Sequence, residues 1–230
     1  MLDLIIKNGQ CYIDGQLQDV NVAIKDGKIH KIGEISEDAK ETINAEGQTV
    51  LPGCIDTQTH FREPGSTDTE DLHSGSRAAI AGGITSVFEM PNTNPPTSNM
   101  KEFQRKIDLA KNRMYCNHAF YFGATADNAD DLASLEGLEG CCGIKLFAGS
   151  STGNLLVAEE DDIDKVFQNA SKVVAVHSED EAILNMNKKL IKQGDVHTHP
   201  VWRSVECAIS STRRIVRIAE KYKKRAHVLH

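Results

Sequence analysis

The sequence predicts an α/β protein with a small β-sandwich or β-module over residues 1–49 and a parallel β/α sheet or barrel over residues 50–230. In the first part, short alternating stretches are separated by tight-turn signals. From residue 50 onward, apolar strands alternate with amphipathic helices, which is typical of parallel sheets. Several of these strands end in polar side chains, as the strands of (β/α)8 TIM barrels do at the end that carries the site.

The first 49 residues have the pattern of short antiparallel strands. Val20, Val22 and Ile24 alternate with polar neighbours, and this period of two places one face of a strand against a core. The pairs Asp14-Gly15 and Asp26-Gly27 are typical of tight turns between paired strands. We therefore expect a module that is separate from the barrel.

The barrel elements follow in order. Apolar runs predict six strands, at about residues 50–55, 84–90, 114–122, 143–147, 173–177 and 226–230. Apolar residues at helical spacing predict helices between them, at about residues 72–81, 99–110, 129–135, 159–170, 181–192 and 205–219, with Ser98 as the N-cap of the second. A complete eight-stranded barrel takes about 250 residues. We therefore expect a truncated chain that lacks the C-terminal strands.

Composition excludes several classes of protein. The 230 residues carry a net charge of −7 and form no basic stripe, which opposes binding to nucleic acid or to acidic membranes. No apolar run approaches the roughly 20 residues of a spanning helix, and the N-terminus lacks the pattern of a signal peptide. The six cysteines form no C-x-x-C pair, so we expect reduced, buried thiols in a cytoplasmic protein.

The densest polar cluster lies in VLPGCIDTQTHFREPG, residues 50–65. Residues two apart on a strand point to the same side, so Asp56, Gln58, His60 and Arg62 share one face if the strand continues that far. A metal ligand and an anion-binding arginine could then meet in one pocket. A histidine in this position is, by itself, more often a polar loop residue. The repetition of polar strand ends along the chain favours a site.

Two segments resemble the signatures of dihydroorotases: HFREPG at residues 60–65 and MPNT at residues 90–93. The likeness extends to GIKLF at residues 143–147, VHSED at residues 176–180 and HVLH at residues 227–230. Dihydroorotases are (β/α)8 metalloenzymes of the amidohydrolase superfamily. The resemblance implies a barrel of amidohydrolase type and the reversible hydrolysis of dihydroorotate to N-carbamoyl-L-aspartate in de novo pyrimidine biosynthesis.

The resemblance also implies a metal site. His60 corresponds to the second histidine of the family's His-x-His pair, and His177 and His230 correspond to ligand histidines on strands five and six. Lys145 matches the lysine that is carboxylated and bridges two metals in the hydantoinase-like branch. Neutral imidazoles suit Zn²⁺, and one or two zinc ions would activate a water and polarise the scissile carbonyl. Without the resemblance, Lys145 would be read as a salt-bridged lysine on an apolar strand.

Substrate recognition is implied for Arg62 and Asn92, which match the groups that hold the substrate's carboxylate. An arginine can grip a carboxylate with two parallel hydrogen bonds, and an asparagine can donate beside it without adding charge. This pair separates a dihydroorotase from a hydantoinase or an allantoinase, which need not bind that carboxylate.

Two departures from the family pattern leave alternatives open. Gln58 stands where the family has the first histidine of the pair, and a neutral amide oxygen is a weaker zinc ligand, so one metal position could be weakened or lost. The family's catalytic Asp is expected beyond His230, so this chain supplies no catalytic residue. The alternatives are a non-catalytic scaffold that associates with aspartate transcarbamoylase, or a related hydantoinase or allantoinase. A homodimer is expected in either case.

Overall fold

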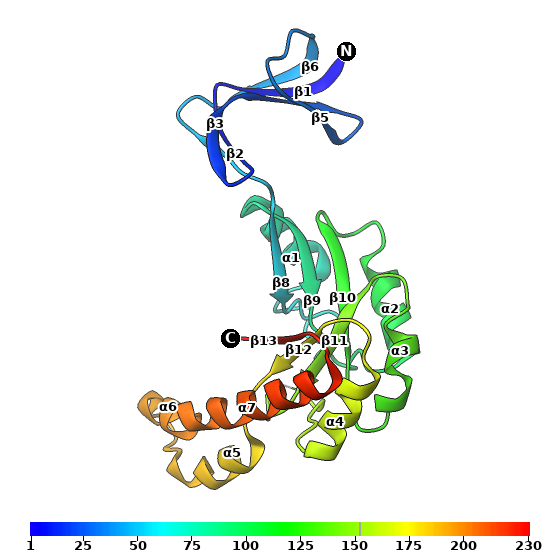
Figure 1. Cartoon of the computed structure of the whole chain (residues 1–230), viewed down its shortest axis with the longest axis vertical. Coiled ribbons are helices and arrows are strands. Elements are labelled where there is room, and N and C mark those ends of the chain that lie inside the picture. Colours follow the sequence, from blue (N-terminus) through cyan, green and yellow to red (C-terminus); the bar gives the residue numbers. More distant parts are fainter. Residues whose placement is uncertain (152) are drawn as a thin grey trace. The chain divides into compact units, whose positions relative to one another are not determined.

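The structure is a computed structural model that describes residues 1–151 and 153–230. The chain separates into two compact units, Met1–Gly53 and Cys54–His230 (Figure 1). Each unit has its own sheets and its own apolar cluster, and each is described by itself.

The N-terminal unit holds two small sheets. A four-stranded sheet has the order β5 (Lys28–Gly33), β4 (Asn21–Lys25), β1 (Leu2–Lys7), β6 (Ala39–Asn44), and a three-stranded sheet has the order β3 (Gln16–Asp19), β2 (Gln10–Ile13), β7 (Thr49–Val50). The predicted Asp-Gly turns are confirmed: they join β2 to β3 and β4 to β5. All four of their residues have positive φ, the backbone of the mirror-image turns that suit twisted hairpins.

The predicted start of the barrel at residue 50 is wrong. Val50 belongs to β7 and pairs with Cys11 in the N-terminal unit. The first barrel strand, β8, is Cys54–Thr59. The physical reason is the intervening Pro52-Gly53, because proline has no N–H to continue a ladder and glycine weakens a strand.

The second unit confirms the predicted α/β architecture with six strands. Its sheet has the order β13 (Ala226–Val228), β12 (Val174–His177), β11 (Cys141–Phe147), β10 (Asn117–Gly123), β9 (Ile84–Glu89), β8, and every pairing in it is parallel. The helices are α1 (Leu72–Ala81), α2 (Met100–Ala110), α3 (Leu132–Leu135), α4 (Glu160–Asn169), α5 (Glu181–Asn187), α6 (His199–Trp202) and α7 (Val205–Tyr222). In Figure 1, α2, α3 and α4 follow one another along one side of the curled sheet. None of the helices described has the length and hydropathy needed to cross a bilayer.

The main core lies between this sheet and its helices, and alternation along the strands shows which side chains face it. Val174 and Val176 belong to the large cluster that includes helical residues such as Phe103, Phe167 and Ile215. Ala175, between the two valines, belongs to a smaller cluster with Tyr121 and Leu229. The two clusters therefore occupy opposite faces of the sheet. Lys145 lies between Ile144 and Leu146 of the large cluster, so it shares the second face with Ala175.

Several predicted boundaries change for local reasons. Asn99, rather than Ser98, caps α2, since its side chain accepts a hydrogen bond from Glu102 N at 2.9 Å. The helix expected over residues 181–192 ends at Asn187 and continues as a 3₁₀ turn, Lys188–Leu190. Cys54 is exposed, contrary to the expectation of buried thiols, because β8 is an edge strand of the sheet.

A buried ion pair anchors the end of β9 to α2. Lys106 and Glu89 are both fully buried, with 2.5 Å between Lys106 Nζ and Glu89 Oε2, and Nζ also donates to Met90 O at 3.1 Å. The other carboxylate oxygen, Glu89 Oε1, is buried and has no hydrogen-bond partner among the residues that the structure describes. Burial raises the pKa of Glu89 to about 7, against the attraction of Lys106 and Arg62. The pair therefore holds the strand end that leads into Asn92 at a considerable desolvation cost.

Removing one partner of this pair should be far more damaging than removing both. Lys106→Met leaves Glu89 buried without its ion-pair partner, and we expect a loss of about 3–5 kcal/mol at pH 8. The double variant Glu89→Leu/Lys106→Met should recover most of that loss. The measurement is urea unfolding. The exposed pair Arg217–Glu160, with N···O of 2.8 Å, is the control, and Arg217→Met should cost less than about 1 kcal/mol. Equal losses in the single and double variants would contradict this account.

Candidate active site

The parallel register of the second unit brings polar groups to the C-terminal edge of its sheet. His177 ends β12 and is paired with Phe147 at the end of β11, while Lys145 is paired with Gly123 at the end of β10. Thr59 ends β8 and is paired with Glu89 at the end of β9. Because parallel strands end at the same edge, the residues that follow them can form one site.

Two of the predicted metal ligands, His177 and His230, are in contact. His177 Nδ1 lies 3.3 Å from His230 Nε2, and their ring centroids are 4.9 Å apart. Two nitrogens bound to one tetrahedral zinc at about 2.05 Å would be separated by about 3.3 Å as well. Burial lowers the pKa of His177 to about 4, so the ring is neutral at physiological pH. A pair of neutral imidazoles at this separation fits zinc in its chemistry and in its spacing.

Lys145 lies next to this pair on the same face of the sheet. Its side chain is 1% exposed, and its Nζ sits 4.5 Å from the centre of the Phe147 ring. Burial lowers the pKa of Lys145 to about 7, and the charge of Lys145 in turn depresses the pKa values of His60 and His177. A substantial share of neutral amine is therefore present at physiological pH. That is the form a carboxylation reaction requires, so the predicted carboxylated lysine is chemically compatible with this setting.

His60, a predicted metal ligand, contacts Asn92, a predicted substrate residue. His60 Nδ1 lies 2.9 Å from Asn92 Oδ1. An amide oxygen accepts only, so with this assignment of the amide the imidazole carries its proton on Nδ1 and presents a lone pair on Nε2. Burial, helped by the charge of Arg62, lowers the pKa of His60 to about 4. His60 is therefore also a neutral imidazole in the form that suits a metal ion.

Arg62 is half-buried, and its charge acts on both His60 and Glu89. The loop that carries it is held by backbone bonds, Arg62 N to Glu70 O at 3.0 Å and Ser66 N to Arg62 O at 2.8 Å. The neighbouring carboxylate, Glu63, accepts bonds of 2.7 and 3.1 Å from Arg113 and one of 3.0 Å from Leu72 N. Glu63 was assigned no role from the sequence, and in the structure it anchors the loop against helix α1.

The loop after β8 requires a glycine at position 65. The φ of Gly65 is +125°, a backbone conformation that side chains rarely adopt, and an added Cβ would lie 3.0 Å from the Asn94 side chain and 3.2 Å from its backbone. The loop after β8 is therefore pressed closely against the loop after β9. A second contact between them is the bond from Asn94 N to Pro64 O at 3.0 Å. This packing brings the segment of Arg62 to the segment of Asn92.

Two site residues were missed from the sequence, Glu179 and Arg203. Glu179 Oε2 lies 2.7 Å from His177 Nε2 and also binds the guanidinium of Arg203. A carboxylate two residues after a predicted ligand histidine was the available signal for Glu179. Arg203 gave none, since 24 residues separate it from Glu179 along the chain.

The predicted metal ligands do not all lie in contact with one another, although the resemblance implies a single site. Within residues 1–151 and 153–230, no group of three or more His, Cys, Asp or Glu side chains is placed to share one metal ion. His177 and His230 are in contact, whereas His60 contacts Asn92 instead. Gln58 is half-buried on β8, one residue before that strand ends. The assignments of His60, Lys145, His177, His230 and Gln58 as metal ligands therefore stay predictions.

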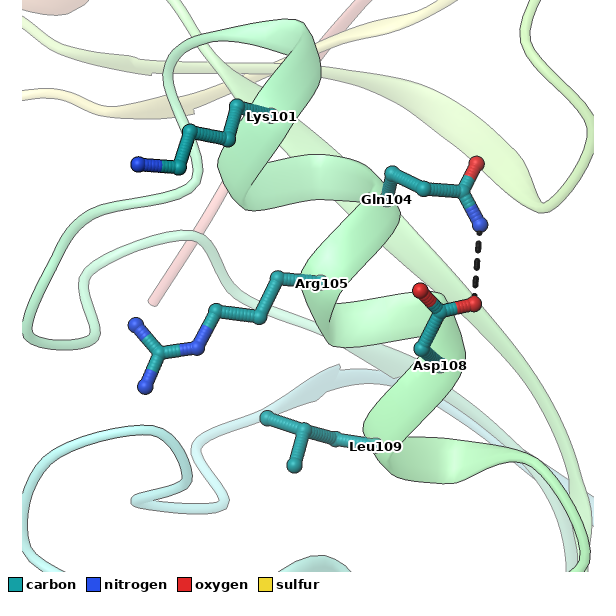
Figure 2. Close-up of a pocket in the computed structure, with 5 residues that line it drawn as sticks. All are labelled: Lys101, Gln104, Arg105, Asp108 and Leu109. Carbon is teal, nitrogen blue, oxygen red and sulfur yellow. Dashed lines mark hydrogen bonds between the residues drawn. The ribbon is translucent and has the colours of Figure 1, made fainter.

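Two hollows near these elements differ in their relation to the site. One, of about 140 Å³, lies just past the end of β11 and is lined by Phe147, Ser150 and Leu155, among others. The other, of about 470 Å³, runs along α2 and contains none of the predicted site residues. Figure 2 shows Lys101, Arg105 and Leu109 on one side of that helix, with Gln104 bonded to Asp108 at 3.0 Å. Only the first hollow adjoins the strand ends.

The shifted pKa of Lys145 makes stability depend on pH. Between pH 7 and 10.5 the unfolded chain holds a proton on Lys145 that the folded chain has lost, so the stability contributed by this group is present above pH 10.5 and is lost as pH falls to 7. We expect the metal-free wild-type chain to gain stability relative to Lys145→Met as pH rises. The unfolding free energy of the wild type minus that of the variant should increase by on the order of 1 kcal/mol per pH unit. The measurement is urea unfolding at pH 7, 8.5 and 10. The exposed Lys101→Met should leave the profile unchanged, and a parallel profile for Lys145→Met would refute the assignment.

Comparison with known proteins agrees with this geometry. The chain is 34% identical over its whole length to a dihydroorotase of Methanosarcina mazei, and 33% identical over 99% of its length to an allantoinase of Escherichia coli. It covers 51% and 53% of those proteins, so it spans about half the length of the curated relatives it matches.

Solved structures and a family model give the same result. The L-hydantoinase (dihydropyrimidinase) from Arthrobacter aurescens superposes with a TM-score of 0.91 at 26% identity, over all of this chain and 53% of that one. A D-hydantoinase superposes with a TM-score of 0.85 at 28% identity, over all of this chain and 52% of its own. The model of the amidohydrolase family matches residues 49–228. The chain therefore belongs to the amidohydrolase family.

Proposed function

We propose that the protein is a zinc-dependent cyclic amidohydrolase with dihydroorotase specificity, which interconverts dihydroorotate and N-carbamoyl-L-aspartate in pyrimidine biosynthesis. The observation that carries this proposal is the 2.9 Å contact between Asn92 and His60, because it puts a predicted carboxylate-binding amide beside a predicted metal ligand. The segments HFREPG and MPNT, which supply these residues, are the ones that resemble dihydroorotases.

His60, His177, His230 and Lys145 would hold the metal, with Lys145 in its carboxylated form if two ions bind. Bound zinc would supply Lewis acidity toward the ring amide and lower the pKa of a water to near 7. The imidazoles are suited to this role because burial keeps His60 and His177 neutral, with pKa values of about 4.

Arg62 and Asn92 would choose the substrate. The exocyclic carboxylate of dihydroorotate offers two oxygens in a plane, which match the fork of a guanidinium. The charge of Arg62 lowers the pKa of His60, so the two side chains are close in space. A substrate whose carboxylate binds Arg62 would therefore have its ring next to the predicted metal ligands. The loop is held by Glu63 and Gly65, which limits the freedom that binding would have to remove.

A second candidate function is a non-catalytic scaffold that associates with aspartate transcarbamoylase. Gln58 in place of a ligand histidine favours it. So does the fact that, in the part of the chain described, no three His, Cys, Asp or Glu side chains converge on one metal position. The contact of His177 with His230 and the burial of Lys145 favour the enzyme. A homodimer is proposed for either function.

The proposal is tested by metal content and then by ligand preference. After dialysis against metal-free buffer, we expect one or two zinc ions per folded chain. The zinc-loaded protein should bind dihydroorotate and N-carbamoyl-L-aspartate at least about tenfold more tightly than hydantoin or allantoin, which lack the carboxylate. Arg62→Met should remove this preference, because a hydrogen bond to a charged group is worth about 1.5–3 kcal/mol, or roughly 10- to 100-fold. Isothermal titration calorimetry measures both affinities.

Arg105→Met is the matched control, since Arg105 lies on the exposed face of α2 and should leave ligand affinity unchanged. Equal affinity for all four ligands would remove Arg62 and Asn92 from substrate recognition and would favour a hydantoinase or allantoinase. A folded chain without zinc would overturn the enzyme proposal and favour the scaffold.

A further inference from the structure

We propose that Glu179 and Arg203 are positioning residues for His177: they fix which ring nitrogen carries the proton, so that Nδ1 is presented to His230. This inference rests on the proposed function insofar as His177 is a metal ligand. The contacts themselves do not depend on it. Neither Glu179 nor Arg203 was among the site residues predicted from the sequence.

The carboxylate determines the tautomer of His177. An ionised Glu179 can only accept hydrogen bonds, so the 2.7 Å contact with His177 Nε2 requires the proton on that nitrogen. Nδ1 then carries a lone pair, and it is Nδ1 that lies 3.3 Å from His230 Nε2. The other tautomer would direct a lone pair at a carboxylate and lose this bond. A carboxylate behind a ligand histidine sets its orientation in just this way.

Arg203 determines where the carboxylate can be. Its Nη1 binds the same oxygen, Oε2, that contacts His177, and its Nη2 donates to Ser150 O at 2.9 Å. The backbone N and hydroxyl of Ser150 in turn donate to Glu181 at 2.7 Å each. One guanidinium therefore ties the loop after β11 to the loop after β12, with a different nitrogen of its planar fork on each.

The position of Arg203 is itself fixed by its neighbour Trp202. The Arg203 guanidinium carbon lies 4.4 Å from the centre of the Trp202 ring, and Trp202 Nε1 donates to Leu184 O at 3.0 Å. Asn187 also donates to Trp202 O at 3.1 Å, so Trp202 is held against α5. Since α5 begins two residues after Glu179, these contacts close a ring from β12 through α5 and Trp202 back to Glu179.

This ion pair differs from the other pairs formed by α7 and the residues just before it. The side chains of Arg203 and Glu179 are 20% and 16% exposed, whereas those of Arg217 and Glu160 are 61% and 51% exposed. The Arg217–Glu160 pair is therefore a matched control for the Arg203–Glu179 pair. It joins the same two residue types at an exposed position, where its loss should affect stability alone.

The test reads the tautomer directly in the metal-free protein. With ¹⁵N-labelled histidine, the wild-type chain should show His177 protonated on Nε2 and unprotonated on Nδ1, a state that ring ¹⁵N shifts distinguish; His177→Gln assigns the signals. Glu179→Ala and Arg203→Met should give a mixture of tautomers. In both variants zinc affinity, measured by competition with a chromophoric chelator, should fall about 10- to 100-fold. Arg217→Met should change neither reading. Arg203→Lys keeps the charge but replaces the planar fork of two nitrogens with one ammonium, and it should give an intermediate tautomer ratio if Arg203→Met fails to fold.

The outcomes separate this inference from the proposed function. A wild-type chain with one tautomer but no zinc would overturn the metal function and support the positioning role. Zinc binding with an unchanged tautomer and affinity in both variants would overturn the positioning role alone. An effect of Glu179→Ala without an effect of Arg203→Met would overturn the part assigned to Arg203.

Discussion

Parallel pairing of strands β8 to β13 is the constraint on which the candidate site depends. The ladder aligns Phe147 with His177 and Thr59 with Glu89, so the chain segments that leave these strands emerge at one edge. A shift of one residue in a strand would turn its polar end toward the helices, because successive side chains point to opposite faces. The contacts of His60 with Asn92 and of His177 with His230 follow from this register rather than from any local preference of the four residues.

Burial then determines the chemistry of the groups that the ladder has assembled. His60, Lys145 and His177 all have pKa values lowered chiefly by removal from water, so the uncharged form of each is favoured. The charged partners stand around them: Arg62 beside His60, and Glu179 with Arg203 beside His177. A neutral imidazole has the lone pair that binds zinc, and a carboxylate beside a histidine orients its ring.

How much of this could be predicted from the sequence depends on the range of the interaction. Strand and helix periodicity are local, so five of the six barrel strands and the long helix α7 were predicted within a few residues. The strand expected at residue 50 failed because Pro52-Gly53 moves its beginning to Cys54, and the pairing of Val50 with Cys11 depends on a contact across 39 residues of chain. The placement of His177 beside His230 could be anticipated from polar residues that recur at strand ends. Arg203 could not, because its partner is set by the tertiary path through α5 and α6.

The buried Glu89–Lys106 pair has a consequence for how this chain can change over evolutionary time. Either residue alone would destabilise the folded protein, because a buried ionisable side chain needs its partner to offset the loss of hydration. A mutation at one of the two positions therefore passes through a destabilised protein unless the other position changes with it. Residues 89 and 106 are expected to vary together among relatives, as one inherited unit, although 17 positions separate them in the chain.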